Sequence, residues 1–194
     1  MILYGASGHA KVVIDICQKL NINISAIWDD NEAITSILNY SVCKFDKNDA
    51  IRDKVIIAIG NNIVRKRIAE NFQFRFGIIV HPEAVIDETS KINEGTVIMA
   101  GSIINSSTII GKHCIVNTSS SIDHECILED YVHISPNATL CGGVNVGEGT
   151  HIGAGAVIIP NISIGKWCTI GAGSVVLKDV LDGQKVVGNP AREI

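Results

Sequence analysis

An aliphatic residue occurs at every sixth position from Ile86 to Val176, without interruption. Neither an α-helix, with 3.6 residues per turn, nor a flat strand, with a period of two, produces this repeat. A parallel β-helix built from hexapeptides does. Three hexapeptides complete one triangular coil, so we expect residues eighteen apart to stack at about one strand spacing, roughly 4.8 Å. The positions are Ile86, Ile92, Ile98, Ile104, Ile110, Val116, Ile122, Leu128, Ile134, Leu140, Val146, Ile152, Ile158, Ile164, Ile170 and Val176.

A second column, two residues before each aliphatic, consists mostly of Ala, Ser, Thr, Cys or Val. Because residues two apart on a strand share a face, both columns are predicted to fill the interior. Cys114, Cys126 and Cys168 belong to this column, where a thiol is a compact apolar group. The residue after the aliphatic is often Gly, Asn or Asp, as at Asn105 and Gly111. These residue types tolerate positive φ, so we expect the corners of the coil there.

The first eighty residues show a different pattern, in which short apolar runs alternate with helix-like stretches. The apolar runs span 2–4, 24–28, 55–59 and 76–80, and the helix-like stretches span 11–20 and 63–72. Such alternation predicts a parallel sheet with helical crossovers. We therefore expect a Rossmann-like α/β domain at 1–80, followed by an all-β parallel β-helix domain at 81–194.

A glycine-containing turn, Gly5 to Ala10, joins the first predicted strand to the first helix. A nucleotide phosphate normally binds at such a turn, on the helix N-terminus. Asp29 and Asp30 end the second predicted strand, where an acid normally meets the ribose or base. Each signal alone is weak, because the turn reads G-x-x-G-x-A rather than G-x-G-x-x-G. Two alternative interpretations are therefore kept: the glycine turn binds no ligand, and Asp29 and Asp30 are solvated turn residues.

Histidine is the natural base near neutral pH, and the sixfold register shows which histidines point outward. His133 and His151 each precede an interior aliphatic and are eighteen apart, so they should stack on one face. His124 lies just past a corner, and Gly142 follows it by eighteen residues. A base beside an unobstructed main-chain N–H is the arrangement that acyl transfer requires. Glu125 could fix the tautomer of His124 if the corner relaxes the alternation of side chains; an ordinary surface histidine remains the alternative.

Composition excludes several classes of protein. The net charge is −4 and no basic run occurs, which argues against nucleic-acid binding. No apolar stretch of about 18 residues occurs, so we expect no membrane insertion. The six cysteines form no CxxC pair and no secretory signal is apparent. We therefore expect a cytoplasmic protein with free thiols.

Four segments carry a resemblance to a known family: GASGH at 5–9, DD at 29–30, AIGNN at 58–62 and NTSSSIDHE at 117–125. Together they resemble the bacterial sugar O/N-acyltransferases of the sialic-acid O-acetyltransferase type, over essentially the whole chain. Within that family the chain is most similar to N-acetyltransferases that act on UDP-4-amino-4,6-dideoxy-N-acetyl sugars, as in bacillosamine synthesis. The resemblance implies a left-handed β-helix, acetyl-CoA as co-substrate, no metal, and a homotrimer with active sites between subunits.

The resemblance also implies a role for individual residues. His124 would be the general base for the C4 amine of the sugar, and Glu125 its partner. The residues near acetyl-CoA would be His133, Gly142, Ala154 and Ala172, and those near the nucleotide sugar would be Ser7, Gly8, His9, Asp29, Asp30, Gly60, Asn61 and Asn117. Relatives often carry Gly where this chain has Ala154 and Ala172, a change that main-chain contacts would tolerate. The amine would attack the thioester directly, because Cys126 is expected in the interior.

Other functions remain open. The same chemistry could serve O-acetylation of sialic acid or N-acetylation of GDP-perosamine, and turnover on UDP- and GDP-sugars would distinguish these acceptors. A zinc enzyme of the γ-carbonic anhydrase type would need three converging histidines, for which His113, His124 and His133 are candidates. A non-catalytic scaffold would explain the repeat but neither the GASGH turn nor the His124–Glu125 pair.

Overall fold

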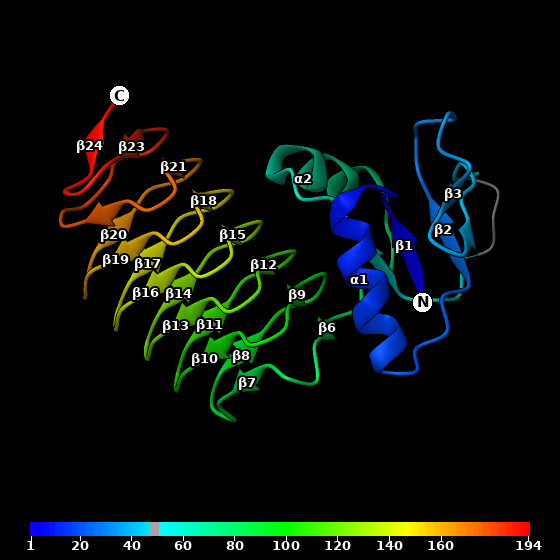
Figure 1. The fold of residues 1–194 in the computed structure, drawn as a ribbon, viewed down its shortest axis with the longest axis horizontal. Helices are drawn as coiled ribbons and strands as arrows, with labels where there is room; N and C mark the ends of the chain where they lie inside the picture. Colours follow the sequence, from blue (N-terminus) through cyan, green and yellow to red (C-terminus); the bar gives the residue numbers. More distant parts are fainter. Residues whose placement is uncertain (47–50) are drawn as a thin grey trace.

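The computed structural model describes residues 1–46 and 51–194, and shows an α/β region followed by a solenoid of short parallel strands (Figure 1). Each repeat aliphatic is the second residue of a two-residue strand, from Ile86 to Val176. Strands eighteen residues apart pair in parallel; Ile104, for example, pairs with Ile86 and with Ile122. The predicted β-helix and its eighteen-residue period are therefore confirmed.

The described strands of the solenoid form three walls of a triangular coil, which we name the first wall, the second wall and the histidine wall. The first wall contains β7 (Val85–Ile86), β10 (Ile103–Ile104), β13 (Ser121–Ile122), β16 (Thr139–Leu140), β19 (Val157–Ile158) and β22 (Val175–Val176). The second contains β8 (Lys91–Ile92), β11 (Ile109–Ile110), β14 (Ile127–Leu128), β17 (Asn145–Val146) and β20 (Ser163–Ile164). The histidine wall contains β6 (Ile79–Val80), β9 (Val97–Ile98), β12 (Ile115–Val116), β15 (His133–Ile134), β18 (His151–Ile152), β21 (Thr169–Ile170), β23 (Lys185–Val187) and β24 (Arg192–Glu193).

The two predicted interior columns form the core of the solenoid. Both are buried along nearly their whole length, and only their first members, such as Ile86 and Ile92, stay partly exposed. Cys114, Cys126 and Cys168 are buried in the second column and are free thiols, as expected. Burial of apolar side chains at about 25 cal/mol per Å² is the main force that stacks successive coils.

The corners differ from the sequence-based prediction. Positive φ occurs at the third residue after the aliphatic, as at Ser107 and Asn137, and not at the first. Gly111 follows its aliphatic directly and has no positive φ, but a Cβ there would lie 2.6 Å from the carbonyl carbon of Glu129 in the next coil. Glycine at that position is therefore required by close stacking of coils, and the prediction of left-handed backbone there was wrong.

The N-terminal region is built on a parallel sheet with β1 (Ile2–Tyr4) between β2 (Ala26–Trp28) and β5 (Val55–Ile57). The described elements also include helices α1 (Gly8–Lys19) and α2 (Asn62–Asn71) and a hairpin of β3 (Ser36–Ile37) and β4 (Tyr40–Ser41). Neither described helix is long or apolar enough to cross a membrane.

The apolar run at 76–80 does not form a further strand of the N-terminal sheet. Phe76 makes a single parallel bridge to Val55, whereas β6 pairs with β9 of the solenoid. Val80 lies six residues before Ile86, so β6 follows the register of the solenoid rather than that of the sheet. The division into domains at 80/81 stays a prediction.

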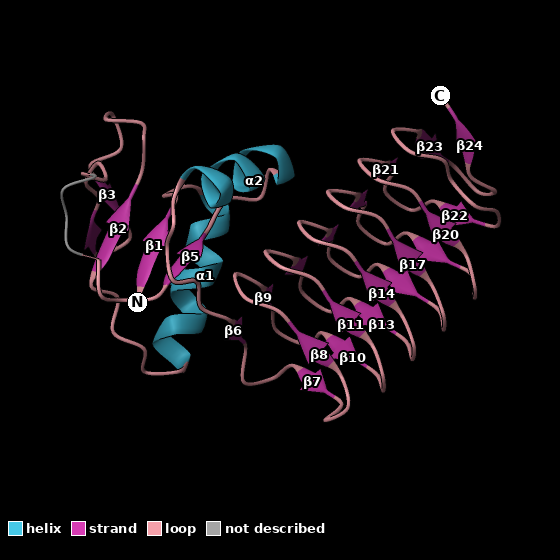
Figure 2. Cartoon of the chain, turned by 180° about the vertical axis from the view of Figure 1, so that it is seen from behind, coloured by secondary structure: helices cyan, strands magenta, loops and turns pink. Residues whose placement is uncertain are grey.

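Helices α1 and α2 lie between the small sheet and the solenoid (Figure 2). Ile79, Val97 and Ile115, which point outward from the histidine wall, are buried in one core with residues of α1 such as Val13 and Ile14. In the next two coils the equivalent positions are His133 and His151. The apolar contact thus ends where the two histidines begin.

Candidate functional site

The turn between the first and second walls, residues 123–126, is named the base corner. His124 Nδ1 lies 3.0 Å from Glu125 Oε2, and both side chains are exposed, by 54% and 71%. Glu125 has a φ of 58°, in the left-handed region. This backbone conformation breaks the alternation of an extended strand, and the two adjacent side chains meet. The contact that the corner was expected to permit is present.

Asp123 holds the main chain of the base corner. Its Oδ1 accepts hydrogen bonds from the N–H of His124 at 2.8 Å and from Asn105 Nδ2, one coil earlier, at 3.0 Å. The hydrogen bond from Asn105, followed by that from His124, lowers the pKa of the Asp123 carboxyl. The direction of the His124 side chain is therefore set by two coils and not by one flexible turn.

Gly142 lies directly beside the imidazole of His124. A Cβ at Gly142 would lie 2.6 Å from both Cε1 and Nε2 of that ring, so only glycine fits. Because the Glu125 carboxylate accepts at Nδ1, we assign the ring proton to Nδ1 and a free lone pair to Nε2. Among residues 1–46 and 51–194, no acceptor pairs with the N–H of Gly142. The corner thus combines a basic nitrogen with an unpaired main-chain donor.

His133 and His151 stack on the histidine wall, with ring centroids 4.8 Å apart and an interplanar angle of 12°. Asn117 Oδ1 accepts from the N–H of Thr118 at 2.8 Å, so its amide nitrogen faces His133 Nε2, at 3.2 Å. The Nε2 atom of His133 is therefore the acceptor. Ser135 Oγ lies 2.7 Å from Nε2 of His151.

Desolvation lowers the pKa of both wall histidines, although the side chain of His133 is only partly buried and that of His151 is exposed. Desolvation lowers the pKa of His133 to about 3, with further lowering from the charges of His151, Arg65 and His9, whereas a hydrogen bond with the main chain of Gly60 acts in the opposite direction. Partial desolvation, followed by the charge of Arg65, lowers the pKa of His151. At neutral pH His133 is thus an uncharged group with fixed hydrogen-bond partners.

The turn between β1 and α1 presents unpaired groups. Ser7 is the N-cap residue of α1 and makes no side-chain capping hydrogen bond. A Cβ at Gly8 would meet no heavy atom within 4 Å. His9 Nε2 is buried without a partner in the described part of the chain, and burial lowers the pKa of His9 to about 4, with Arg65 adding to the shift. A helix N-terminus with open space above it suits an anionic ligand.

Asp29 and Asp30 hold the ends of the strands beside this turn. Asp29 Oδ2 accepts from the N–H of Ala6 at 2.7 Å, and its Oδ1 accepts from the N–H of Asn31 at 2.9 Å. Asp30 Oδ1 accepts from the hydroxyl of Tyr4 at 2.7 Å. Burial, together with this hydrogen bond, raises the pKa of Tyr4. The two acids therefore have a structural role in closing the turn.

Gly60 and Asn61 lie between β5 and α2. Asn61 caps α2, since its Oδ1 accepts from the N–H of Val64 at 3.0 Å. Both residues line a pocket of about 380 Å³ together with His133 and Trp167. The structure thus brings these two sequence-predicted residues next to the histidine wall.

Ala154 and Ala172 occupy the turns that lead from the histidine wall to the first wall, in successive coils. Both are exposed, and Gly173 N–H donates to the carbonyl of Ala154 at 2.8 Å. Within the described ranges, no acceptor pairs with the N–H of either alanine. Their main chains are therefore available to a ligand that lies along this edge.

The predicted site residues form separate groups in one chain. The base corner is the vertex of the triangular coil opposite the histidine wall, because residues 123–126 join the first wall to the second. The N-terminal turn, Gly60, Asn61 and Asn117 lie at or beside the histidine wall. His124, Glu125 and Gly142 therefore do not meet Ser7, Gly8 or His9 within a single copy.

The three histidines proposed as zinc ligands also lie apart. His113 is buried between the rings of Phe76 and Tyr131, at centroid distances of 4.4 and 5.3 Å. His124 lies at the base corner and His133 on the histidine wall. No group of three His, Cys, Asp or Glu side chains in the described residues has the arrangement of a metal site.

Sequence reasoning did not identify Asn62, Arg65 and Trp167 beside the pocket. Arg65 is 1% exposed, although its helix reads as an ordinary polar surface helix. Trp167 has a φ of 56° and is one coil after Gly149, where a Cβ would lie 2.4 Å from the indole. The sixfold register could have placed Trp167 over Gly149, since the two are eighteen apart, but no sequence signal predicts the burial of Arg65.

Comparisons with known proteins agree with the fold. Residues 1–72 match the PglD N-terminal domain family, and residues 143–178 match the family of bacterial transferase hexapeptides (six repeats). UDP-N-acetylbacillosamine N-acetyltransferase of Bacillus subtilis (strain 168) is 48% identical over 118 residues, which are 50% of this chain and 50% of that protein. The matched segment thus spans about half the length of this curated relative.

Solved structures that resemble the whole chain include two complexes with a coenzyme A ligand. The acetyltransferase domain of PglB from Neisseria gonorrhoeae FA1090, in complex with acetyl coenzyme A, has a TM-score of 0.90 and 32% identity, covering 100% of this chain and 98% of that one. PerB from Caulobacter crescentus, in complex with CoA and GDP-perosamine, has a TM-score of 0.93 and 34% identity, covering 100% and 96%. This chain therefore belongs to the bacterial hexapeptide-repeat sugar acetyltransferases that carry a PglD-type N-terminal region, as the resemblance in its sequence indicated.

Proposed function

We propose that the protein transfers the acetyl group of acetyl-CoA to the C4 amine of a nucleotide-linked amino sugar. The observation that carries this proposal is the base corner, where His124 has a carboxylate at Nδ1 and the unpaired N–H of Gly142 beside Nε2. A basic nitrogen and a main-chain donor at one point are the two groups that acyl transfer to an amine needs.

The proposed reaction is a direct attack. The amine forms a bond to the thioester carbonyl carbon while His124 Nε2 takes its proton, and the Gly142 N–H donates to the developing oxyanion. The C–S bond then breaks and the thiolate of CoA leaves. Glu125 stabilises the protonated imidazole. Cys126 is no nucleophile, because it is fully buried and burial raises its thiol pKa to about 11.

Acetyl-CoA is placed along the edge formed by Ala154 and Ala172, with their free N–H groups contacting the pantetheine arm. Gly142 lies near the thioester. His133, which already has partners at Nε2 and toward Gly60, orients its surroundings as a neutral group and does not exchange protons. The CoA complexes of the two solved relatives support acetyl-CoA as the donor.

The acceptor is placed over the N-terminal turn. Its diphosphate lies at Ser7, Gly8 and His9, where α1 begins. The sugar lies near Gly60, Asn61 and Asn117, and the nucleoside lies toward Asp29 and Asp30, which also hold the strand ends. A UDP-4-amino-4,6-dideoxy-N-acetyl sugar is the first candidate, because the curated relative is named for UDP-N-acetylbacillosamine.

Separation of the base corner from the N-terminal turn favours a homotrimer in which one copy supplies His124 to the acceptor held by the next. Exposed aliphatic side chains flank the base corner on both walls: Ile103 is 40%, Ile109 38% and Ile127 43% exposed. An exposed apolar patch of this kind is typical of a protein–protein interface. Light scattering of the full chain should give three times the mass of one copy.

The activity is tested by incubating the protein with acetyl-CoA and a panel of nucleotide amino sugars, with product detection by mass spectrometry. We expect an acetylated UDP-4-amino sugar. GDP-perosamine is the second candidate, because PerB was solved with it; faster turnover of the GDP-sugar would reassign the nucleotide. Absence of an acetylated product with every sugar in the panel would refute the proposal.

A further inference from the structure

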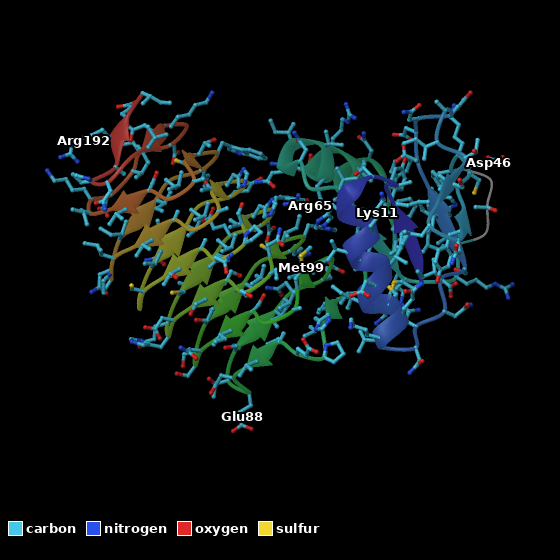
Figure 3. All side chains as sticks on the ribbon, viewed as in Figure 1. Lys11, Asp46, Arg65, Glu88, Met99 and Arg192 are labelled. Carbon is cyan, nitrogen blue, oxygen red and sulfur yellow. The ribbon has the colours of Figure 1, made fainter. Side chains whose placement is uncertain are left out.

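Arg65 of α2 is buried between the N-terminal region and the solenoid (Figure 3). All its described hydrogen bonds go to uncharged oxygen atoms. Nε donates to His113 O at 2.7 Å; Nη1 donates to Ile59 O at 3.0 Å and Gly60 O at 3.1 Å; Nη2 donates to Asn62 Oδ1 at 2.8 Å and Tyr131 O at 2.9 Å. In the described chain no carboxylate forms an ion pair with it. This is a buried cation held by main-chain carbonyls.

Asn62 extends the same contact by one coil. Its Nδ2 donates to the carbonyl of Gly149 at 2.9 Å, with Thr150 O at 3.4 Å. His113, Tyr131 and Gly149 are eighteen apart and occupy the same left-handed position, with φ of 54°, 62° and 67°. Arg65 and Asn62 thus bond to equivalent carbonyls in three successive coils, and we name this pair the clamp.

The other end of the clamp holds the turn before α2. Both carbonyls accepting from Nη1 belong to this turn, which ends β5 and lines the pocket below His133 and His151. His133 in turn has a hydrogen bond with the main chain of Gly60. One guanidinium therefore holds the Ile59–Gly60 turn at a fixed place relative to the solenoid corner that contains His113 and Tyr131. Loss of the guanidinium would leave several buried carbonyls unpaired.

The clamp also places the fixed positive charge of Arg65 beside the Gly60–Asn61 turn. The Arg65 charge contributes to lowering the pKa of His9, His133 and His151, after burial or other causes. These rings consequently stay neutral, and the cation in this part of the site is Arg65. A diphosphate is the kind of ligand that such an uncompensated positive charge favours.

We propose that Arg65 and Asn62 are positioning residues for the nucleotide sugar: they set the Gly60–Asn61 turn at a fixed distance from the histidine wall, and so determine acceptor affinity without touching the acetyl donor. The inference rests on the proposed function. Ala154 and Ala172, which are placed along the acetyl-CoA edge, lie at a different corner of the coil, and among the described residues neither accepts a hydrogen bond from the clamp.

Steady-state kinetics of Asn62→Ala and Arg65→Gln test the clamp, with Arg67→Gln as the control, since Arg67 is exposed on the same helix. Loss of buried hydrogen bonds should raise the KM for the nucleotide sugar by about tenfold, with the KM for acetyl-CoA changed by less than about twofold. Arg65→Lys keeps the charge but loses the forked donors, so it should not restore the acceptor KM. A wild-type acceptor KM in Arg65→Lys, or a parallel rise in both KM values, would overturn the proposal.

Hydrogen exchange of the full-length variants provides a readout without turnover. Amides of 59–65 should exchange faster in Asn62→Ala and Arg65→Gln, whereas those of the solenoid beyond β18 should not change. Asn62→Ala keeps the guanidinium, so it still tests the clamp if Arg65→Gln does not fold. Unchanged exchange at 59–65 together with an unchanged acceptor KM in folded Asn62→Ala would contradict the clamp, whereas an inactive wild-type protein would instead refute the proposed function.

Discussion

Two histidine sites on the same solenoid differ in almost every physical property. His124 is exposed at a corner, has a carboxylate at Nδ1 and lies against bare backbone. His133 and His151 are packed against each other on a wall, with amide, hydroxyl and main-chain partners and lowered pKa values. The same side chain is thus suited to accept a proton in one place and to hold a fixed geometry in the other.

The difference arises from position in the coil. His133 on the histidine wall lies where the apolar core shared with the N-terminal region ends, so its side chain loses part of its water on folding. Corner residues lie at a vertex and keep water on one side. Because Glu125 has left-handed backbone at the base corner, its carboxylate can approach the neighbouring His124, which an extended strand would prevent. In the proposed function, the base corner therefore carries the chemistry and the histidine wall contributes to recognition of the acceptor.

Replacement of the corner base should have the largest effect. In His124→Ala we expect kcat to fall by about 10²–10⁴-fold, because the amine loses its proton acceptor. Saturating steady-state assays would measure this. His133→Gln is the matched wall variant and should change mainly the KM values. A turnover number near wild type in His124→Ala, or a larger kcat loss in His133→Gln, would reverse the roles of the two sites.

A side chain at Gly142 should have the next largest effect. A Cβ there would lie 2.6 Å from the His124 ring, so Gly142→Val should displace the imidazole and cover the main-chain donor. We expect kcat to fall by about 10²-fold, the usual range for loss of an oxyanion donor. Gly111→Val is the control for disturbed stacking of coils, because a Cβ there would lie equally close, 2.6 Å, to the main chain of Glu129. Equal losses in both variants would assign the effect to disturbed stacking.

Removal of the carboxylate at the base corner should have a smaller effect. Glu125→Gln keeps the size and a hydrogen-bond acceptor but removes the charge that stabilises the protonated ring. We expect a fall in kcat of about tenfold, with KM values unchanged, measured at saturating substrates. Both side chains are exposed, so solvent reduces the contribution of the ion pair. A loss as large as that of His124→Ala would give Glu125 a more direct role.

Acid should destabilise the protein through buried histidine rings beside the histidine wall. Burial lowers the pKa of His113 to about 4, whereas the unfolded chain titrates near 6.5. Between these values the unfolded state binds more protons, so the free energy of unfolding falls as the pH drops below 6.5. At pH 5 the loss from this residue is about 2 kcal/mol. Denaturation of His113→Phe at pH 7 and 5 should show a smaller loss than that of the wild type. Identical pH dependence in the two proteins would exclude His113 as the cause.

Much of this comparison follows from the sequence, because the sixfold column fixes the phase of every residue in the coil. The phase predicts that His133 and His151 stack outward, that Cys126 is interior, and that Gly142 lies one coil after His124; the structure confirms each of these placements. Each hexapeptide places the same types of side chain in the interior, so the period of six can be recognised in a single sequence.

Other features are not encoded in the repeat. The left-handed residue of each corner was assigned to the wrong position, because the glycines there serve the approach of the next coil rather than positive φ. Burial of Arg65 depends on a contact across 48 and 66 residues with the carbonyls of His113 and Tyr131, and no pattern within α2 reports it. The strand at 79–80 pairs with the solenoid because Val80 follows the sixfold register. The sequence-based prediction started that register at Ile86 and therefore assigned residues 79–80 to the N-terminal sheet.

The central claim, that the base corner of one copy acts on the acceptor held at the wall of another, is tested most directly by mixed trimers. His124→Ala removes the base, and Gly8→Phe fills the space above the N-terminal turn, where a Cβ meets no atom within 4 Å. Each variant alone should be inactive. Trimers containing both, purified through two different tags, should regain about one third of wild-type activity, since one of three interfaces then combines two intact parts. Mixed trimers that stay as inactive as the separate variants would show that both parts act within one copy, and would contradict the account.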